Sequence, residues 1–278
     1  MKKQDLLFIP LFLVIVFTSC QTEEVSNTTD DIEVVDTKRT HLYFNEEIPL
    51  ETITIGKEEF SLQRLDDKYL CEGDMLLTEE ELKRLHSPDD NAKGNLAPIT
   101  WANVWPNGDV YYQFDLYFPE AYRSTIRRAM QNISSRTGVT FRYGRGNGNY
   151  INIFKGNGNY SRLGMVGGRQ PLSLERNNVG VAMHELGHAL GLAHEHARAD
   201  RDNFIYVHPN YVSQHRIHGY RWGWFDWSSI MLYPSSYKPS IRTYDMVRLY
   251  DGRPFNNVIE SGIYRLSSGD VSTLNYMY

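Results

Sequence analysis

Cysteine is nearly absent from this chain, which has Cys20 and Cys71 and no other cysteine among its 278 residues. No intramolecular disulfide can therefore form within the long region after residue 71. The stability of that region must come from buried apolar side chains and from any bound metal. A region of this size can bury enough surface to form such a core.

Positive charge is also in short supply, because 29 Lys and Arg stand against 34 Asp and Glu, for a formal net charge of −5. Without a basic excess, nucleic acid is not expected as a partner. Hydrophobic residues make up 41% and charged residues 23% of the chain, as in an ordinary soluble protein. The length fits one or two domains.

The longest apolar run, residues 6–17, is too short to span a bilayer comfortably. It follows two lysines and precedes a Thr-Ser-Cys triplet that ends at Cys20, a pattern typical of a secretory signal. A cysteine directly after two small residues resembles bacterial lipoprotein signals, in which this cysteine is lipidated and becomes the N-terminus. We therefore expect a lipoprotein-type signal at residues 1–20 with lipidation at Cys20. Ordinary secretion, with a free or removed cysteine, is the alternative.

Polar residues without an apolar period fill positions 21–39, which predicts a flexible tether. Residues 40–96 are richer in apolar positions. In that segment we predict a strand at 50–60, a helix at 78–85 that Thr78 and Glu81 cap together, and a turn-rich linker at 87–94.

Alternating and helical apolar periods predict regular elements after residue 100. The predicted strands are at 110–114, 139–143 and 150–154, and an amphipathic helix is predicted at 120–136. A further helix should begin at Val179 after the capping pair Asn177-Asn178.

His184 and His188 lie four residues apart on this last helix, so their imidazoles share one face and can bind one zinc ion. Glu185 is adjacent to the first histidine, as the general base of a zinc hydrolase would be. Gly191 is expected to take the left-handed backbone that ends the helix, so that the chain turns back and brings His194 as a third ligand. Three histidines leave a fourth position open, which is the catalytic pattern.

The remaining histidines in this part of the chain are expected to be surface or packed residues and not ligands. They are His196, His208, His215 and His218.

The sequence from His184 to Asp202, HELGHALGLAHEHARADRD, resembles the zinc segment of the astacin family of metzincin peptidases. That family extends its motif as HExxHxxGxxHExxRxDRD, and every fixed position is present here. Other stretches resemble the family across residues 97–278, namely WPNG at 105–108, GGRQ at 167–170, SIMLY at 229–233 and the end of the chain. There are two departures. SIMLY has leucine where the family usually has histidine, and the two disulfides of most members are missing, which indicates a bacterial branch.

The resemblance implies an α+β fold, in which a metzincin catalytic domain has an N-terminal mixed sheet plus helices, a C-terminal subdomain and an active-site cleft between them. It implies that Met231 lies beneath the zinc. It also implies that Tyr233 approaches the zinc and stabilises the tetrahedral intermediate of peptide hydrolysis. After activation, the new N-terminus would reach Glu195, the residue after the third histidine.

The resemblance further implies that residues 40–96 are a small propeptide before a catalytic domain at 97–278. Family propeptides often carry an FEGD-like segment whose aspartate caps the zinc, and here the segment reads Cys71-Glu72-Gly73-Asp74. Asp74 is the favoured cap because the Gly-Asp pair matches the family. Cys71 is the second candidate, since thiolates bind zinc well, and a buried Cys71 without zinc contact is the third reading. Activating cleavage is expected between residues 90 and 97.

These features predict a zinc endopeptidase, made as a zymogen, with one Zn²⁺ and with protein or peptide substrates. Substrate should bind as an added β-strand near residues 163–168. The protein is expected to be a monomer, secreted or held as a lipoprotein on the outer membrane or cell surface of a bacterium, and to touch the membrane only through its lipid. The alternative is a catalytically inactive surface-binding lipoprotein with the same fold, but the presence of both Glu185 and Tyr233 argues against it.

Overall fold

The computed structural model describes residues 49–55, 58–86, 104–218 and 223–278. The predicted signal, the tether, the lipidation site Cys20 and the linker at 87–94 lie outside these residues. Within them, the fold is α+β, as predicted. No helix of this described part is long and apolar enough to cross a membrane.

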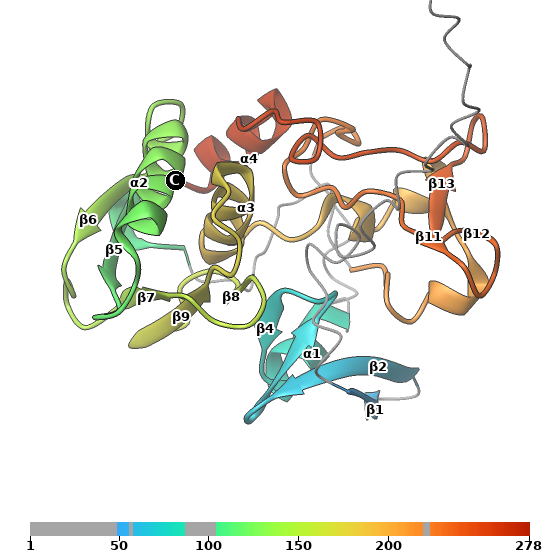
Figure 1. The fold of residues 1–278 in the computed structure, drawn as a ribbon, viewed down its shortest axis with the longest axis horizontal. Helices are drawn as coiled ribbons and strands as arrows, with labels where there is room; N and C mark the ends of the chain where they lie inside the picture. Colours follow the sequence, from blue (N-terminus) through green and yellow to red (C-terminus); the bar gives the residue numbers. More distant parts are fainter. Residues whose placement is uncertain (1–48, 56–57, 87–103, 219–222) are drawn as a thin grey trace, which may run out of the picture. The chain divides into compact units, whose positions relative to one another are not determined.

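A small β-meander and one helix form the first described segment (Figure 1). Its elements are β1 (Leu50–Ile55), β2 (Glu58–Leu65), β3 (Lys68–Cys71), β4 (Met75–Leu77) and α1 (Glu79–His86). The single strand predicted at 50–60 was wrong, because the chain reverses and Ile55 pairs with Glu58 across the hairpin.

The predicted cap of α1 is confirmed. The side-chain oxygen of Thr78 accepts from the backbone N–H of Glu81 at 3.2 Å, and the Glu81 carboxylate accepts from the N–H of Thr78 at 2.7 Å. This reciprocal pair satisfies two backbone donors that the first helical turn leaves open. The capping box therefore fixes where the helix begins after β4.

The second part of the sheet is mostly parallel. Its strands are β5 (Asp109–Phe114), β6 (Thr140–Tyr143), β7 (Tyr150–Phe154), β8 (Tyr160–Ser161) and β9 (Arg169–Ser173). β9, β7, β5 and β6 run parallel, and β8 pairs antiparallel with β9. The strands predicted at 110–114, 139–143 and 150–154 are confirmed. β4 adds to β8 in parallel through Met75 and Ser161, so the strands of both parts join in one nine-stranded sheet of order β1-β2-β3-β4-β8-β9-β7-β5-β6.

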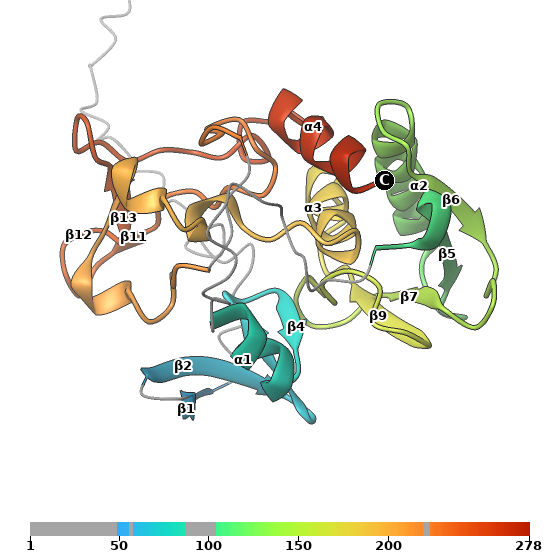
Figure 2. The ribbon, with the colours of Figure 1, turned by 180° about the vertical axis from the view of Figure 1, so that it is seen from behind.

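Two helices pack on each other beside this sheet, as both views show (Figures 1 and 2). They are α2 (Glu120–Ser134), which confirms the helix predicted at 120–136, and α3 (Val179–Ala189). The buried face of α2 carries Ile126, Ala129, Met130 and Ile133, whose spacing of three and four gives one apolar stripe. These side chains join the main core with residues of the sheet and of α3.

The chain after α3 has short elements and long connections. They comprise the 3₁₀ turns at Glu195–Ala197, Arg201–Asn203 and Pro209–Tyr211, the strand pairs β10 (Ile205–Val207) with β13 (Met246–Arg248) and β11 (Tyr237–Lys238) with β12 (Thr243–Tyr244), and the last helix α4 (Ser268–Met277). Ser267 and Asp270 form a capping box at the start of α4. The Asp270 carboxylate also accepts from Ser229 and from the N–H of Ile230, which ties α4 to the segment that contains Met231.

Candidate metal centre

α3 begins at its predicted cap and carries two histidines on one face. The side chain of Asn178 accepts from the backbone N–H groups of Gly180 at 2.8 Å and Val181 at 3.1 Å. His184 and His188 follow one helical turn apart and are fully buried. Every residue of α3 is buried, so the helix holds both imidazoles in a packed environment.

A glycine ends this helix and turns the chain toward the third histidine. Gly191 has φ +101° and donates its N–H to the carbonyl of His188 at 2.7 Å. The left-handed backbone that the sequence predicts there is therefore confirmed, and it is a conformation that glycine adopts without a Cβ penalty. Three residues later His194 is buried beside the other two.

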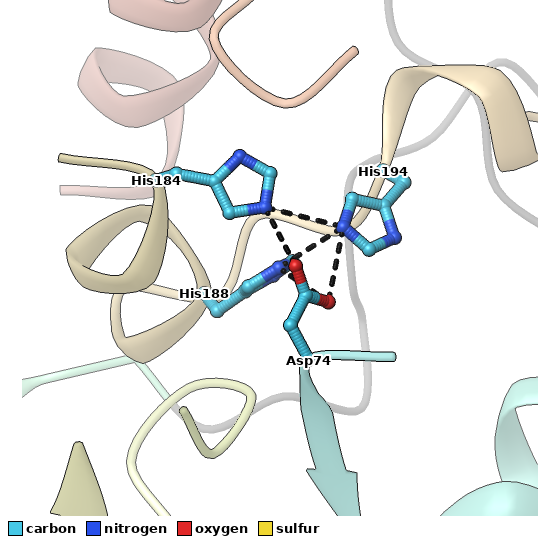
Figure 3. A group of neighbouring side chains, drawn as sticks. All are labelled: Asp74, His184, His188 and His194. Carbon is cyan, nitrogen blue, oxygen red and sulfur yellow. Dashed lines mark hydrogen bonds and ion pairs between the residues drawn. The ribbon is translucent and has the colours of Figure 1, made fainter. Parts of the chain in front are cut away.

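The three imidazoles converge on a common point with one carboxylate (Figure 3). Nε2 of His194 lies 3.2 Å from Nε2 of both His184 and His188. Asp74 lies against all three, with Oδ2 3.0 Å from His184 Nε2 and Oδ1 3.3 Å from His188 Nε2 and 3.2 Å from His194 Nε2. These four residues form a group able to hold a metal ion.

The second nitrogen of each imidazole has its own acceptor. Nδ1 of His184 donates to the carbonyl of Ile230 at 2.8 Å, and Nδ1 of His188 donates to the carbonyl of Leu192 at 2.7 Å. Nδ1 of His194 donates to the carboxylate of Glu72. Each contact leaves the Nε2 lone pair directed at the common point, which is the tautomer that metal binding needs.

The electrostatics of the group favour a bound cation. Burial tends to lower the pKa of His194, but the nearby Asp74 and Glu72 carboxylates raise it to about 9. Burial tends to raise the pKa of Asp74, but the charges of His194 and His188 and hydrogen bonds from the histidines lower it well below its ordinary value. Oδ1 of Asp74 has no hydrogen-bond partner among the described residues. Three imidazoles, one carboxylate and an excess of negative charge fit a zinc ion.

Glu185 lies beside this group and is fully buried. Neither of its carboxylate oxygens has a hydrogen-bond partner among the described residues. Burial, together with the charge of Asp74, raises the pKa of Glu185 well above its ordinary value. Such a carboxylate is suited to take up a proton.

Tyr233 and Met231 approach from the segment after α3. The Tyr233 hydroxyl lies 2.6 Å from Asp74 Oδ2 and 2.9 Å from the carbonyl oxygen of Glu72, and its ring centroid is 4.2 Å from that of His194. Met231 is buried against α3, where a Cβ on Gly187 would come within 2.8 Å of the methionine sulfur. A glycine at 187 therefore lets the Met231 side chain pack directly against α3.

The two sequence candidates for the zinc cap lie in different environments. Asp74 is among the three imidazoles, whereas Cys71 is buried in an apolar cluster with Phe60, Met75 and Leu77. Of the two groups among the described residues that are able to hold a metal, one contains Asp74 and neither contains the cysteine. Burial raises the pKa of the Cys71 thiol well above its ordinary value, and the charges of Glu72 and Asp74 add to that effect.

Glu195 follows His194 in the sequence and lines a cavity of about 420 Å³. Its carboxylate accepts from the backbone N–H of Asp226 at 2.7 Å and lies 3.3 Å from Arg198. Burial raises the pKa of Glu195 to about 8, although Arg198 opposes the shift.

The strand predicted at 163–168 was wrong. The strand beside the centre is β8 at Tyr160–Ser161, and the N–H of Ser161 donates to the carbonyl of Asp74 at 2.9 Å. Residues 163–168 contain three glycines with left-handed backbone, at φ +69°, +89° and +66°, so an extended strand cannot continue there. The edge available for backbone pairing therefore lies a few residues earlier than predicted.

Glu72 belongs to the Cys71-Glu72-Gly73-Asp74 segment, but the sequence pattern predicts no role for it. Its side chain is 2% exposed, and its carboxylate contacts His194 and lies 3.5 Å from Nε2 of His218. His196 is also fully buried and stacks on the Tyr233 ring at 4.7 Å. His196 and His218, expected to be surface or packed histidines and not ligands, are both buried, and His196 belongs with Glu72 and His194 to a second group able to hold a metal. No spacing in the sequence connects either histidine with residue 72.

Comparison with known proteins now places this geometry in a class. The family model for Astacin, a family of peptidases, matches residues 99–278. The chain is 35% identical over 190 residues to astacin-like metalloprotease toxin 1 of Loxosceles intermedia, covering 63% of this chain and 71% of that one. It is 30% identical over 238 residues to nematocyst expressed protein 6 of Nematostella vectensis, covering 77% and 78%.

A solved structure agrees with these matches. High choriolytic enzyme 1, a hatching enzyme zinc-protease from Oryzias latipes, superposes with a TM-score of 0.55 at 25% identity, covering 63% of this chain and 92% of that chain. The fold and the site thus define a zinc-dependent metallopeptidase that acts on protein or peptide substrates. The chain belongs to the astacin family.

Proposed function

We propose that this chain is a zinc endopeptidase made as a latent precursor, in which residues 40–96 are a propeptide and Asp74 blocks the metal. The observation that carries the proposal is the position of the Asp74 carboxylate, within 3.3 Å of Nε2 of His184, His188 and His194. His184, His188 and His194 would hold one zinc ion, and Asp74 would occupy its fourth position.

A bound zinc ion supplies Lewis acidity toward water and toward the substrate carbonyl. Glu185, buried and without a hydrogen-bond partner among the described residues, takes a proton from water and passes it to the leaving amine. The Tyr233 hydroxyl, which contacts Asp74 in this structure, becomes available once Asp74 leaves and donates to the oxygen that gains charge. Met231 supports the histidines from below.

Substrate backbone would pair with the edge that β4 covers here. β4 lies parallel to β8 through Met75 and Ser161, so it blocks the same backbone groups that an added substrate strand would use. Latency would therefore have two components, a blocked metal and a blocked edge strand.

Activation would proceed by cleavage between residues 90 and 97, after which the new N-terminus reaches Glu195. The cavity beside Glu195 supports this step. For location, we propose secretion, with lipidation at Cys20 as a further step that anchors a monomeric protein to a bacterial outer membrane or cell surface. One of the relatives is named as a toxin, which agrees with a role outside the cell.

Casein digestion tests the proposal most directly. The purified precursor should be nearly inactive, should gain activity after limited proteolysis, and should lose that activity in a chelator and recover it with zinc. N-terminal sequencing of the active form should start between residues 90 and 97. An intact precursor as active as the processed form, or an active form that starts well before residue 85, would contradict latency.

A further inference from the structure

The three histidines of the proposed zinc site donate hydrogen bonds from Nδ1 to acceptors in two different regions of the chain. The acceptors for Nδ1 of His184 and His188 are backbone carbonyls of the catalytic region, at Ile230 and Leu192. The acceptor for Nδ1 of His194 is the carboxylate of Glu72, which belongs to the proposed propeptide. One of the three imidazoles therefore depends for this contact on a segment that activation removes.

Glu72 is placed for this contact by the backbone around it. Glu72 has φ +53° and Gly73 has φ +95°, so the chain makes a tight turn between β3 and β4. A non-glycine residue holds a left-handed backbone only where its surroundings require it. Here the turn directs the carboxylates of both Glu72 and Asp74 at the histidines, and the carbonyl of Glu72 lies 2.9 Å from the Tyr233 hydroxyl.

A carboxylate that accepts from the second nitrogen of a metal-binding histidine has a known physical effect. It fixes the tautomer and the ring orientation, and it raises the basicity of the nitrogen that faces the metal. A charged acceptor does so more strongly than a carbonyl does. His194 stands out among the three ligands because its acceptor is the charged one.

We propose that Glu72 is a positioning residue for His194, so that the propeptide strengthens zinc binding through Glu72 while it blocks the zinc through Asp74. The inference rests on the zinc site and the latency proposed above. Its consequence is that activation weakens zinc binding. The weakening should exceed what the loss of the Asp74 ligand alone would cause, because the Glu72 carboxylate is lost as well. The propeptide is then a metal-retaining element as well as an inhibitor.

The experiment measures zinc affinity of the full-length precursor by competition with a chromophoric chelator. Loss of an outer carboxylate weakens metal binding by about 10–100-fold, and we expect a loss of this size in Glu72→Ala. Glu72→Gln, which keeps an acceptor without the charge, should fall between that variant and wild type. Glu80→Gln, an exposed change on α1 of the same segment, serves as the matched control and should bind zinc as wild type does.

A second measurement separates positioning from simple undocking of the propeptide. Glu72→Ala should lower zinc affinity also in an Asp74→Asn background, and it should shift the visible absorption of the Co²⁺-loaded precursor. Equal affinity in Glu72→Ala and Glu80→Gln, or a loss that vanishes in the Asp74→Asn background, overturns the inference. Zinc binding by the His188→Ala precursor equal to that of wild type would instead overturn the zinc site itself, so the two failures are distinguishable.

Discussion

Two regions of the chain supply buried carboxylates in or next to the histidine group. The carboxylates of one region have partners there, and the carboxylate of the other has no hydrogen-bond partner among the described residues. Asp74 and Glu72, from segment 50–86, contact the three imidazoles and the Tyr233 hydroxyl. Glu185, from α3 of the catalytic region, is equally buried, but neither of its oxygens has a hydrogen-bond partner among the described residues. A buried carboxylate without partners is costly.

Under the proposed function, the first set of contacts belongs to the latent state and the unpartnered Glu185 belongs to turnover. The carboxylates of segment 50–86 are matched to the histidines, whereas the carboxylate that turnover needs has no partner among the described residues while Asp74 is in place. The charge of Asp74 also raises the pKa of Glu185, in addition to the effect of burial. Segment 50–86 thus fills a site whose catalytic group is arranged for a different occupant.

The two regions also differ in their cores. The main cluster of buried residues lies wholly within residues 105–274. The cluster of segment 50–86 is completed by Leu163 and Ala193, which belong to the catalytic region. Removal of the segment should therefore leave the catalytic core intact, while the segment alone would lose part of its own core.

The largest expected effect comes from Glu185→Ala in the processed enzyme. Loss of a general acid–base group lowers kcat/KM by about 10²–10⁴-fold, and the zinc content should stay the same because the three histidines are unchanged. Casein hydrolysis and metal analysis check both points. Glu175→Ala, the same change at an exposed glutamate, is the control. Full activity in Glu185→Ala would sink the proposed mechanism.

The next effect concerns the cap. Asp74→Asn in the precursor removes a charge-assisted contact worth about 1.5–3 kcal/mol, so basal proteolysis should rise roughly 10–100-fold. Cys71→Ala should leave latency unchanged, because the thiol is packed among apolar side chains. Activity of the two uncleaved precursors decides the matter. Strong activation by Cys71→Ala, with none by Asp74→Asn, would make the thiolate the cap.

A smaller effect is expected where α1 docks on the catalytic region. Glu81 carries the capping contact with Thr78, and both of its carboxylate oxygens lie 2.7 Å from Nη2 of the buried Arg162. Glu81→Gln should lower the unfolding free energy of segment 50–86 by about 1–2 kcal/mol, since a hydrogen bond to a charged group is lost. Denaturant unfolding and trypsin sensitivity of the precursor measure this loss. Glu80→Gln is the control, and equal behaviour of the two variants would mean that the Arg162 contact does not hold the segment.

An effect of similar size is expected at Asp245, a buried carboxylate of the catalytic region that has hydrogen-bond partners. Burial tends to raise the pKa of Asp245, but its hydrogen bond with His215, the charge of His215 and the N–H of Ser236 hold it below its ordinary value. The ionised form therefore stabilises the fold above about pH 4, and this contribution is lost as the pH falls toward the lowered pKa. Asp245→Asn should cost about 1–2 kcal/mol at neutral pH.

Unfolding of wild type and Asp245→Asn as a function of pH checks this last prediction. The difference in unfolding free energy between the two proteins should shrink as the pH falls below about 4, because the carboxylate of the unfolded chain takes up a proton there while the folded one stays ionised down to its lowered pKa. A difference that stays constant across that range would show that the carboxylate charge contributes nothing to stability there.

The sequence alone determined the parts of the centre that local geometry controls. The period of a helix places His184 and His188 on one face, Asn178 starts that helix, and Gly191 ends it so that His194 returns to the same place. The capping box of Thr78 and Glu81 was likewise readable from spacing. Each of these features spans only a few residues, and in each the covalent chain and the hydrogen-bond period leave few alternatives.

Only the tertiary structure decided how segment 50–86 meets this centre. From the sequence, Asp74 and Cys71 remained competing candidates for the zinc cap. The substrate-binding edge was predicted at 163–168, whereas the strand beside the centre is β8. No role was predicted for Glu72. The contact between Glu72 and His194 joins residues 122 positions apart, and it exists only because a left-handed turn and the pairing of β4 with β8 bring them together. Contacts of that kind depend on how whole segments dock and not on local spacing, so the sequence pattern fixes the metal-binding histidines but not their outer partners.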